Sequence, residues 1–144
     1  MGVTGEIYQG DGVSIFLPQG WQAFPEGVST SESGVKKLFV YKDAESAFDI
    51  FTHAGLTICY YPEGFIYLTG RGFYSDVRDI EPFPLGEYVW GGYVCNSFGY
   101  PYTVLEGKKD NRYVQIMILE ANGEHRISLY DEDVRRIVES IHIS

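Results

Sequence analysis

YVQIMIL at residues 113–119, Asn122-Gly123 and HRISL at residues 125–129 follow one another in the last third of the chain. Both flanking segments are rich in β-branched and apolar residues. An Asn-Gly pair between two such runs is a strong signal of a hairpin, because Asn and Gly tolerate the positive φ of a type I′ turn. We therefore predict two antiparallel strands, residues 113–119 and 125–129, joined by a tight turn.

The hydrophobic period changes after this hairpin. Val134, Ile137, Val138 and Ile141 recur at the spacing that places side chains on one face of a helix. The run Asp131-Glu132-Asp133 precedes them, and acidic residues in the first turn complement the helix dipole. This run lacks the glycine and the spaced carboxylates of an EF-hand loop, so it predicts a helix start rather than a calcium site. We expect a C-terminal helix that buries its apolar face against the sheet.

Further strands are predicted from apolar runs bounded by turn residues. They span residues 12–18, 37–42, 56–61, 87–95, and 102–106. Residues 87–95 are interpreted as a hairpin around Gly91-Gly92, and one bent strand is the alternative, since paired glycines also mark bulges. Residues 27–34 and 107–111 are predicted to be polar loops.

Two segments have no clear period. Residues 44–51 combine helix-like and strand-like spacings, and a turn leading into a strand is favoured. A helical piece is expected around residues 65–79. The chain is thus predicted to be one α+β domain, residues 1–144, with a mostly antiparallel sheet of about seven or eight strands, a packed C-terminal helix and one possible further helix.

Charge excludes two classes of partner. The chain has 11 Lys and Arg against 20 Asp and Glu, a net charge of −9, whereas nucleic acids and anionic membranes require a basic surface. No apolar run approaches the length of about 20 residues that a membrane span needs, so no membrane insertion is expected. Residues 1–6 lack the features of a signal peptide. An extracytoplasmic location is expected if an export signal has been removed, and a cytoplasmic one otherwise.

No catalytic residue, metal site or cofactor is predicted. The sequence contains no Gly-x-Ser-x-Gly elbow, no Cys-x-x-Cys and no His-x-x-x-His. Cys59 and Cys95 lie in strand-like apolar runs, which favours buried thiols, and a disulfide between neighbouring strands is the alternative. A small thiol or hydrolase-type enzyme that pairs Cys59 or Cys95 with His53 is an alternative function.

Aromatic residues make up 16% of the chain and are dense between Phe65 and Tyr102. Tyr and Trp offer large, stiff contacts that suit sugar stacking or protein docking. The predicted contacts to a protein or carbohydrate partner are Tyr74, Trp90, Tyr93, Tyr100 and Tyr102. The competing interpretation is that these rings form sheet core and cross-strand pairs. The same surface could serve a dimer, so the expected state is a monomer or a weak homodimer.

Two short motifs carry a resemblance to a known family. Leu17-Pro18-Gln19-Gly20-Trp21 closes the first predicted strand, and DVRRIVESI at residues 133–141 forms the predicted helix. With the layout of the chain, they resemble the PsbP/Mog1-like α/β sandwich family. PsbP relatives serve photosystem II, Mog1 relatives bind the Ran GTPase, and many bacterial relatives have no assigned function. Both motifs are packing motifs, so the resemblance implies no site residue.

The missing catalytic constellation and the aromatic excess favour a non-enzymatic binding or accessory domain, and the resemblance suggests a bacterial extracytoplasmic protein. An intracellular Mog1-like protein-binding domain is the alternative.

Overall fold

The computed structural model describes residues 3–10, 12–25, 36–60, 72, 74–109 and 112–143. Strands dominate this part of the chain, together with the α-helix α1 (Glu132–Ser140) and the 3-10 helix η1 (Ala47–Phe51). The strands are β1 (Gly5–Gly10), β2 (Val13–Pro18), β3 (Trp21–Pro25), β4 (Lys36–Lys42), β5 (Gly55–Tyr60), β6 (Ser75–Asp79), β7 (Phe83–Leu85), β8 (Tyr88–Ser97), β9 (Tyr100–Lys109), β10 (Arg112–Leu119), β11 (Ala121–Asn122), β12 (His125–Arg126) and β13 (His142–Ile143). The α+β class with a mostly antiparallel sheet is confirmed.

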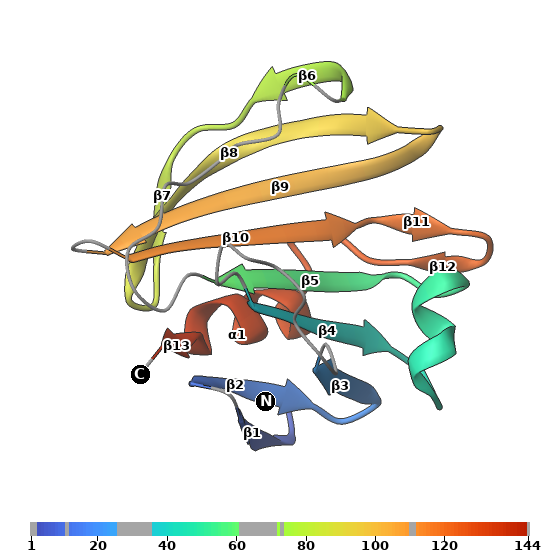
Figure 1. The fold of residues 1–144 in the computed structure, drawn as a ribbon, viewed down its shortest axis with the longest axis vertical. Coiled ribbons are helices and arrows are strands. Elements are labelled where there is room, and N and C mark those ends of the chain that lie inside the picture. The colour runs from blue at the N-terminus through green and yellow to red at the C-terminus, as the bar shows by residue number, and fades with distance from the viewer. Residues whose placement is uncertain are drawn as a thin grey trace.

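One large sheet forms the frame of the molecule. Its eight strands run in the order β3-β4-β5-β10-β9-β8-β6, with β7 also paired to β8 (Figure 1). Each of these pairs is antiparallel. The predicted strands at residues 37–42, 56–61, 102–106 and 113–119 are present as β4, β5, β9 and β10.

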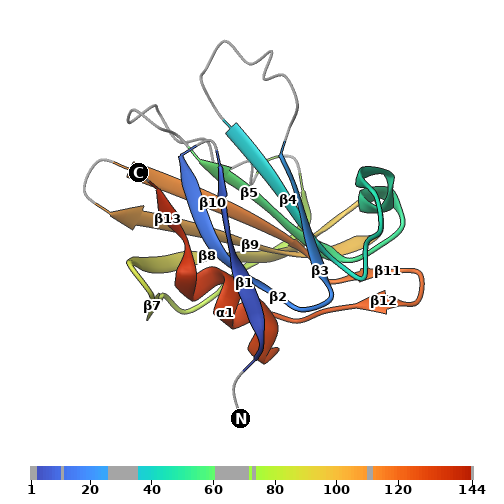
Figure 2. The ribbon, with the colours of Figure 1, turned by 90° about the horizontal axis from the view of Figure 1, so that it is seen from below.

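The main core lies between one face of this sheet and a second layer. That layer consists of α1 and the small sheet β1-β2-β13, and α1 packs beside β2 (Figure 2). The four predicted helix residues Val134, Ile137, Val138 and Ile141 are each at most 1% exposed. Leu38, Leu56, Ile116 and Leu105 of the large sheet meet them in the same cluster. The predicted packing of the C-terminal helix is therefore confirmed.

Ser140 joins α1 to the small sheet. Its hydroxyl accepts the backbone N–H of Phe16 at 2.7 Å and donates to the carbonyl of Ile137 at 2.8 Å. Strand β13 pairs only with Val13 and Ser14 of β2, so the N–H of Phe16 lies beyond its reach. The serine of the DVRRIVESI motif thus satisfies a strand donor that the short β13 leaves without a ladder partner.

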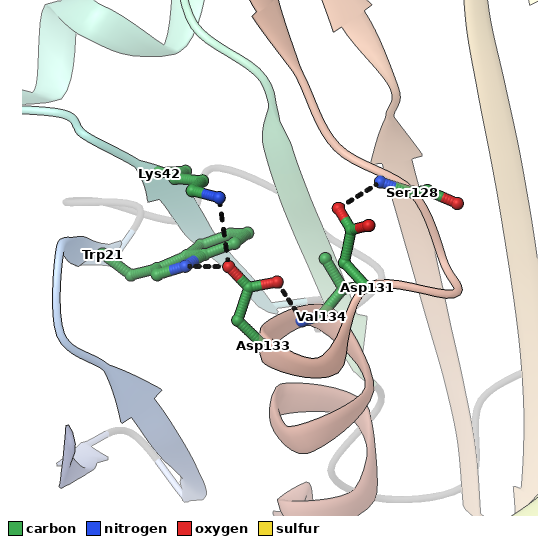
Figure 3. Close-up of polar contacts among 6 residues, drawn as sticks. All are labelled: Trp21, Lys42, Ser128, Asp131, Asp133 and Val134. Carbon is green, nitrogen blue, oxygen red and sulfur yellow. Dashed lines mark hydrogen bonds and ion pairs between the residues drawn. The ribbon is translucent and has the colours of Figure 1, made fainter. Parts of the chain in front are cut away.

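Asp133 anchors the start of α1 to the large sheet (Figure 3). One carboxylate oxygen accepts the indole N–H of Trp21 at 3.0 Å and lies 3.3 Å from the ammonium group of Lys42. The other oxygen accepts the N–H of Val134 at 2.8 Å. Trp21 is only 3% exposed, so its indole N–H depends on this carboxylate.

Asp133→Ala is therefore expected to lower the free energy of unfolding by about 1–3 kcal/mol, because it leaves a buried donor without a partner. Urea denaturation monitored by circular dichroism measures this change. Glu132→Ala is the matched control, since Glu132 is the exposed neighbouring acid of the same helix turn, and its cost should stay within about 0.5 kcal/mol. Equal costs for the two variants would contradict the anchoring role of Asp133.

The predicted hairpin between residues 113–119 and 125–129 is wrong in extent. Strand β10 pairs with β5 on one side and β9 on the other, so both of its edges are occupied. The hairpin contains only β11 and β12, with Gly123 and Glu124 at its centre, and Gly123 has a φ of 61°. Ile127 and Leu129 then turn into the core instead of extending the hairpin.

The segment at residues 87–95 is one bent strand, so the predicted hairpin around Gly91-Gly92 is wrong and the alternative is confirmed. Both glycines lie inside β8, which pairs with β9 from Val89 to Ser97. The loop predicted at residues 107–111 is shorter, because β9 continues to Lys109 and β10 begins at Arg112.

The strand predicted to begin within residues 44–51 is absent there. Residues 47–51 form η1 instead, and it begins after Ser46 because the Asp49 carboxylate accepts the N–H groups of Glu45 and Ser46 at 2.7 and 3.3 Å. The helix expected around residues 65–79 is wrong for residues 75–79, which form β6 along the edge of β8. The rest of that segment, apart from residues 72 and 74, and the predicted loop at residues 27–34 lie outside the described residues.

Glu87 links the turn before β8 to two other elements. Its carboxylate oxygens lie 2.7 Å from the ammonium group of Lys109 and 2.8 Å from Nδ1 of His142. The hydrogen bond from Lys109, followed by that from His142, lowers the pKa of Glu87 below its ordinary value of 4.5. Because the pKa of Glu87 is lower in the folded state, its ionised carboxylate stabilises the fold at pH values above its unfolded pKa. This contribution to stability is lost as the pH falls through the folded pKa.

We expect Glu87→Gln to lower the free energy of unfolding near neutral pH by less than about 1 kcal/mol, since the pair is partly exposed. The difference from the original chain should vanish in acid, once Glu87 is protonated. Urea denaturation at about pH 7 and about pH 3 measures both values. A difference that persists unchanged in acid would show that the side chain acts through packing instead of charge.

Candidate functional site

A cavity of about 490 Å³ opens on the helix-facing side of the large sheet. It lies between strands β8 and β9 on one side and the beginning of α1 on the other. Its apolar wall is formed by Ile80, Phe83, Val94, Leu129 and Tyr130. Pockets of about 300–1,000 Å³ with mainly apolar walls are typical of small-molecule sites.

The lengths of the elements explain why this space stays open. Helix α1 has 9 residues and spans roughly 13 Å, whereas β8 and β9 have 10 residues each and span roughly 33 Å. The second layer shares its core with β4, β5 and β10, and with Trp90 of β8 and Leu105 of β9. The cavity forms where β8 and β9 extend past the start of the helix.

A hydrogen-bonded pair forms the polar part of the cavity. The hydroxyl of Thr103 donates to Oε1 of Glu120 at 2.7 Å, and Thr103 is only 4% exposed. The backbone of Glu120 is held as well, since its N–H donates to the carbonyl of Pro101 and its carbonyl accepts the N–H of Ile127. The carboxylate of Glu120 is therefore fixed in position against the cavity.

Two further charged residues line the cavity. Arg135 extends from α1, and its guanidinium carbon lies 6.0 Å from the centre of the Phe83 ring. Glu81 precedes β7 and lines the same space. With Glu120, the lining contains two carboxylates and one cation that already stacks on an aromatic ring. This arrangement suits an apolar molecule that carries a hydrogen-bond donor or a protonated amine.

The five predicted aromatic contacts do not form one surface. Trp90 belongs to the main core and donates its indole N–H to the carbonyl of Leu85 at 3.0 Å. Trp90 and Tyr93 are both 0% exposed, so neither is available to a protein or carbohydrate partner. Tyr100, which is 44% exposed, lies beside the β8–β9 turn.

Tyr74, Tyr93 and Tyr102 share the opposite face of the large sheet. They surround a second, smaller cluster with Cys95 and Val104. The ring of Tyr93 is buried, and its centre lies 6.2 Å from the centre of the Tyr74 ring. Tyr74 and Tyr102 are half-buried. Burial raises the pKa of both half-buried phenols above the ordinary 10.0, so they stay neutral near pH 7. Much of the aromatic excess is therefore structural.

Both cysteines are buried thiols, as predicted, and the alternative disulfide is wrong. Cys59 lies on β5 and Cys95 on β8, with β10 and β9 between them. Three strand spacings amount to roughly 14 Å along the sheet, whereas a disulfide needs Cα atoms within about 7 Å.

His53 lies away from both thiols. It precedes β5, and the four residue steps from Gly55 to Cys59 already span roughly 13 Å of extended strand. Cys95 is in register with Gly55 across the sheet, but it lies three strands away. Neither Cys59 nor Cys95 is therefore placed to form the predicted catalytic dyad with His53.

None of the residues that line the cavity was predicted from the sequence as a site residue. Thr103 and Glu120 are 17 positions apart and meet only because β9 and β10 pair. One signal was present: Thr103 is two positions from Leu105, so it is a polar residue on the core-facing side of a strand. A hydroxyl at such a position needs a partner, which here is Glu120.

No protein-family model matches this sequence, and no curated protein matches it. The resemblance to PsbP/Mog1-like domains therefore stays a prediction. Among the described residues, no helix is long and apolar enough to cross a membrane. Within the same residues, no three His, Cys, Asp or Glu side chains gather as a metal site would require.

Proposed function

We propose that this chain is a binding domain, not an enzyme, and that its ligand is a small apolar molecule with a protonated amine. The observation that carries the proposal is the cavity of about 490 Å³ in which Glu120, held by Thr103, faces an apolar wall. The apolar part of the ligand would contact Val94, Leu129 and Phe83. The amine would donate to the carboxylate of Glu120, a charge-assisted hydrogen bond.

Phenethylamine is a suitable probe, because it combines one ring with one amine. For so small a molecule, we expect a dissociation constant in roughly the millimolar range by isothermal titration calorimetry or NMR titration. 3-Phenylpropionate, which has a similar shape and the opposite charge, should bind at least about tenfold more weakly, because it meets Glu120 and Glu81.

Two substitutions separate the polar and apolar contributions. Glu120→Gln should weaken phenethylamine about tenfold, because it removes the charge that the amine meets. Val94→Phe should abolish binding by filling the cavity. Glu6→Gln, on the exposed strand β1, is the matched control and should leave the affinity unchanged. Equal affinities of all three variants, or a preference for the carboxylate, would contradict the proposal.

The competing thiol-enzyme hypothesis makes an opposite prediction about Cys95. Burial, followed by the charge of Glu120, raises the pKa of the Cys95 thiol above its ordinary 9.0, so little thiolate forms near neutral pH. Alkylation of Cys59 and Cys95 by iodoacetamide should be at least about tenfold slower in the native protein than in urea. Mass spectrometry after timed quenching measures both rates. A cysteine that reacts rapidly in the native state would support the enzyme.

A further inference from the structure

Two phenylalanines project from one short helix into solvent. In η1, Phe48 is 81% exposed and Phe51 is 74% exposed, and no residue of this helix is buried. Side chains at i and i+3 eclipse one another in a 3-10 helix, so both rings lie on the same face. Figure 1 shows η1 as the green helix at the right edge of the molecule, beside β12.

The backbone around these rings is held firmly. The Asp49 carboxylate caps the start of η1 through Glu45 and Ser46, and the side-chain amide of Asn122 donates to the carbonyls of Phe51 and His53 at 3.1 and 3.3 Å. The rings of His53 and His125 stack with their centres 3.9 Å apart. The β11–β12 hairpin thus fixes the end of η1, and Phe48 and Phe51 are presented on a preorganised support.

The charges on the segment that contains the two rings, residues 43–51, are of one sign. Asp43, Glu45 and Asp49 lie within residues 43–51, and that stretch has no Lys or Arg. The N–H bonds from Glu45 and Ser46 lower the pKa of Asp49, which therefore stays ionised into acid conditions. Glu124 and Arg126 of the adjacent hairpin have opposite charges and offset each other.

We infer that Phe48 and Phe51 form a docking surface for a protein whose apolar pocket is bordered by Lys or Arg side chains. A second copy of this chain is a poor fit, because it would bring the same three carboxylates and a net charge of −9. A lipid surface fits poorly as well, since insertion of the rings would bring Asp49 and Glu45 out of water. A basic partner gains both the burial of the rings and charge complementarity.

A pair of synthetic amphipathic peptides tests this inference with the full chain. One contains only leucine and lysine, and its counterpart contains only leucine and glutamate. The leucine–lysine peptide should bind, with the largest amide shifts at residues 47–51 in NMR spectra. The double variant Phe48→Ser/Phe51→Ser should weaken binding at least about tenfold, as loss of aromatic anchors does. Its thermal melt should match the original chain, because both rings are exposed.

Ile7→Ser is the control, since Ile7 is 65% exposed on β1 and should not change the affinity. The inference is overturned if the double variant binds as tightly as the original chain, or if the glutamate peptide binds equally well. Binding to neutral phosphatidylcholine vesicles that depends on Phe48 would overturn it in favour of a lipid surface. Self-association in sedimentation that disappears in the double variant would overturn it in favour of a second copy.

Discussion

Ile137→Asp is expected to abolish folding. Ile137 is 0% exposed on the inward face of α1, within the cluster that joins both layers of the fold. Loss of the buried isoleucine costs about 2–5 kcal/mol even when alanine replaces it. A carboxylate at the same position adds the cost of burying a charge without a partner, and the sum approaches the whole stability of a typical domain. Circular dichroism and thermal melting should show no cooperative transition.

Glu139→Asp introduces the same residue two positions later, on the exposed face of the helix. Its cost should stay below about 1 kcal/mol, the difference in helix propensity. Cooperative unfolding of Ile137→Asp at a temperature close to that of Glu139→Asp would contradict the two-layer packing.

Gly92→Ala is expected to destabilise the large sheet by at least about 3 kcal/mol. Gly92 has a φ of 135°, a conformation that L side chains rarely adopt. A Cβ atom there would lie 1.9 Å from the carbonyl oxygen of Val104 on the neighbouring strand. The alanine therefore strains its own backbone and pushes β8 away from β9.

Gly91→Ala is the matched control from the adjacent position. A Cβ atom at Gly91 meets no heavy atom within 4 Å, and we expect a change of less than about 1 kcal/mol. Urea denaturation of the two alanine variants, side by side, measures the difference. Equal stabilities would mean that β8 does not follow the described path through Gly92.

The predicted elements that proved correct are those whose own side chains specify a period. Val134, Ile137 and Val138 of α1 and the following Ile141 have helix spacing. In β10, the buried Val114, Ile116 and Ile118 alternate with less buried residues, as in a strand with one face on the core. Strand β1 was missed because it is an exposed edge strand, with Glu6 and Ile7 both outside the core. The extent of the C-terminal hairpin was wrong because Asn122-Gly123 identifies a turn but not the partners of β10.

The candidate site was less accessible to sequence reasoning than the fold. Aromatic density pointed to Trp90 and Tyr93, yet both rings are buried in the domain itself. The cavity depends on how far β9 extends past α1, which no local pattern encodes. Glu120 acquires its role only through Thr103 on the neighbouring strand, and Arg135 only through the position of Phe83.

The proposed ligand site is the space between β8, β9 and α1. The most direct measurement is an isotope-filtered NMR experiment that detects contacts between phenethylamine and the methyl groups of the protein. We predict nuclear Overhauser effects from the ring to Val94, Leu129 and Ile80, and their disappearance in Val94→Phe. Contacts from the ring to methyl groups elsewhere, or none while the probe is bound, would contradict the claim.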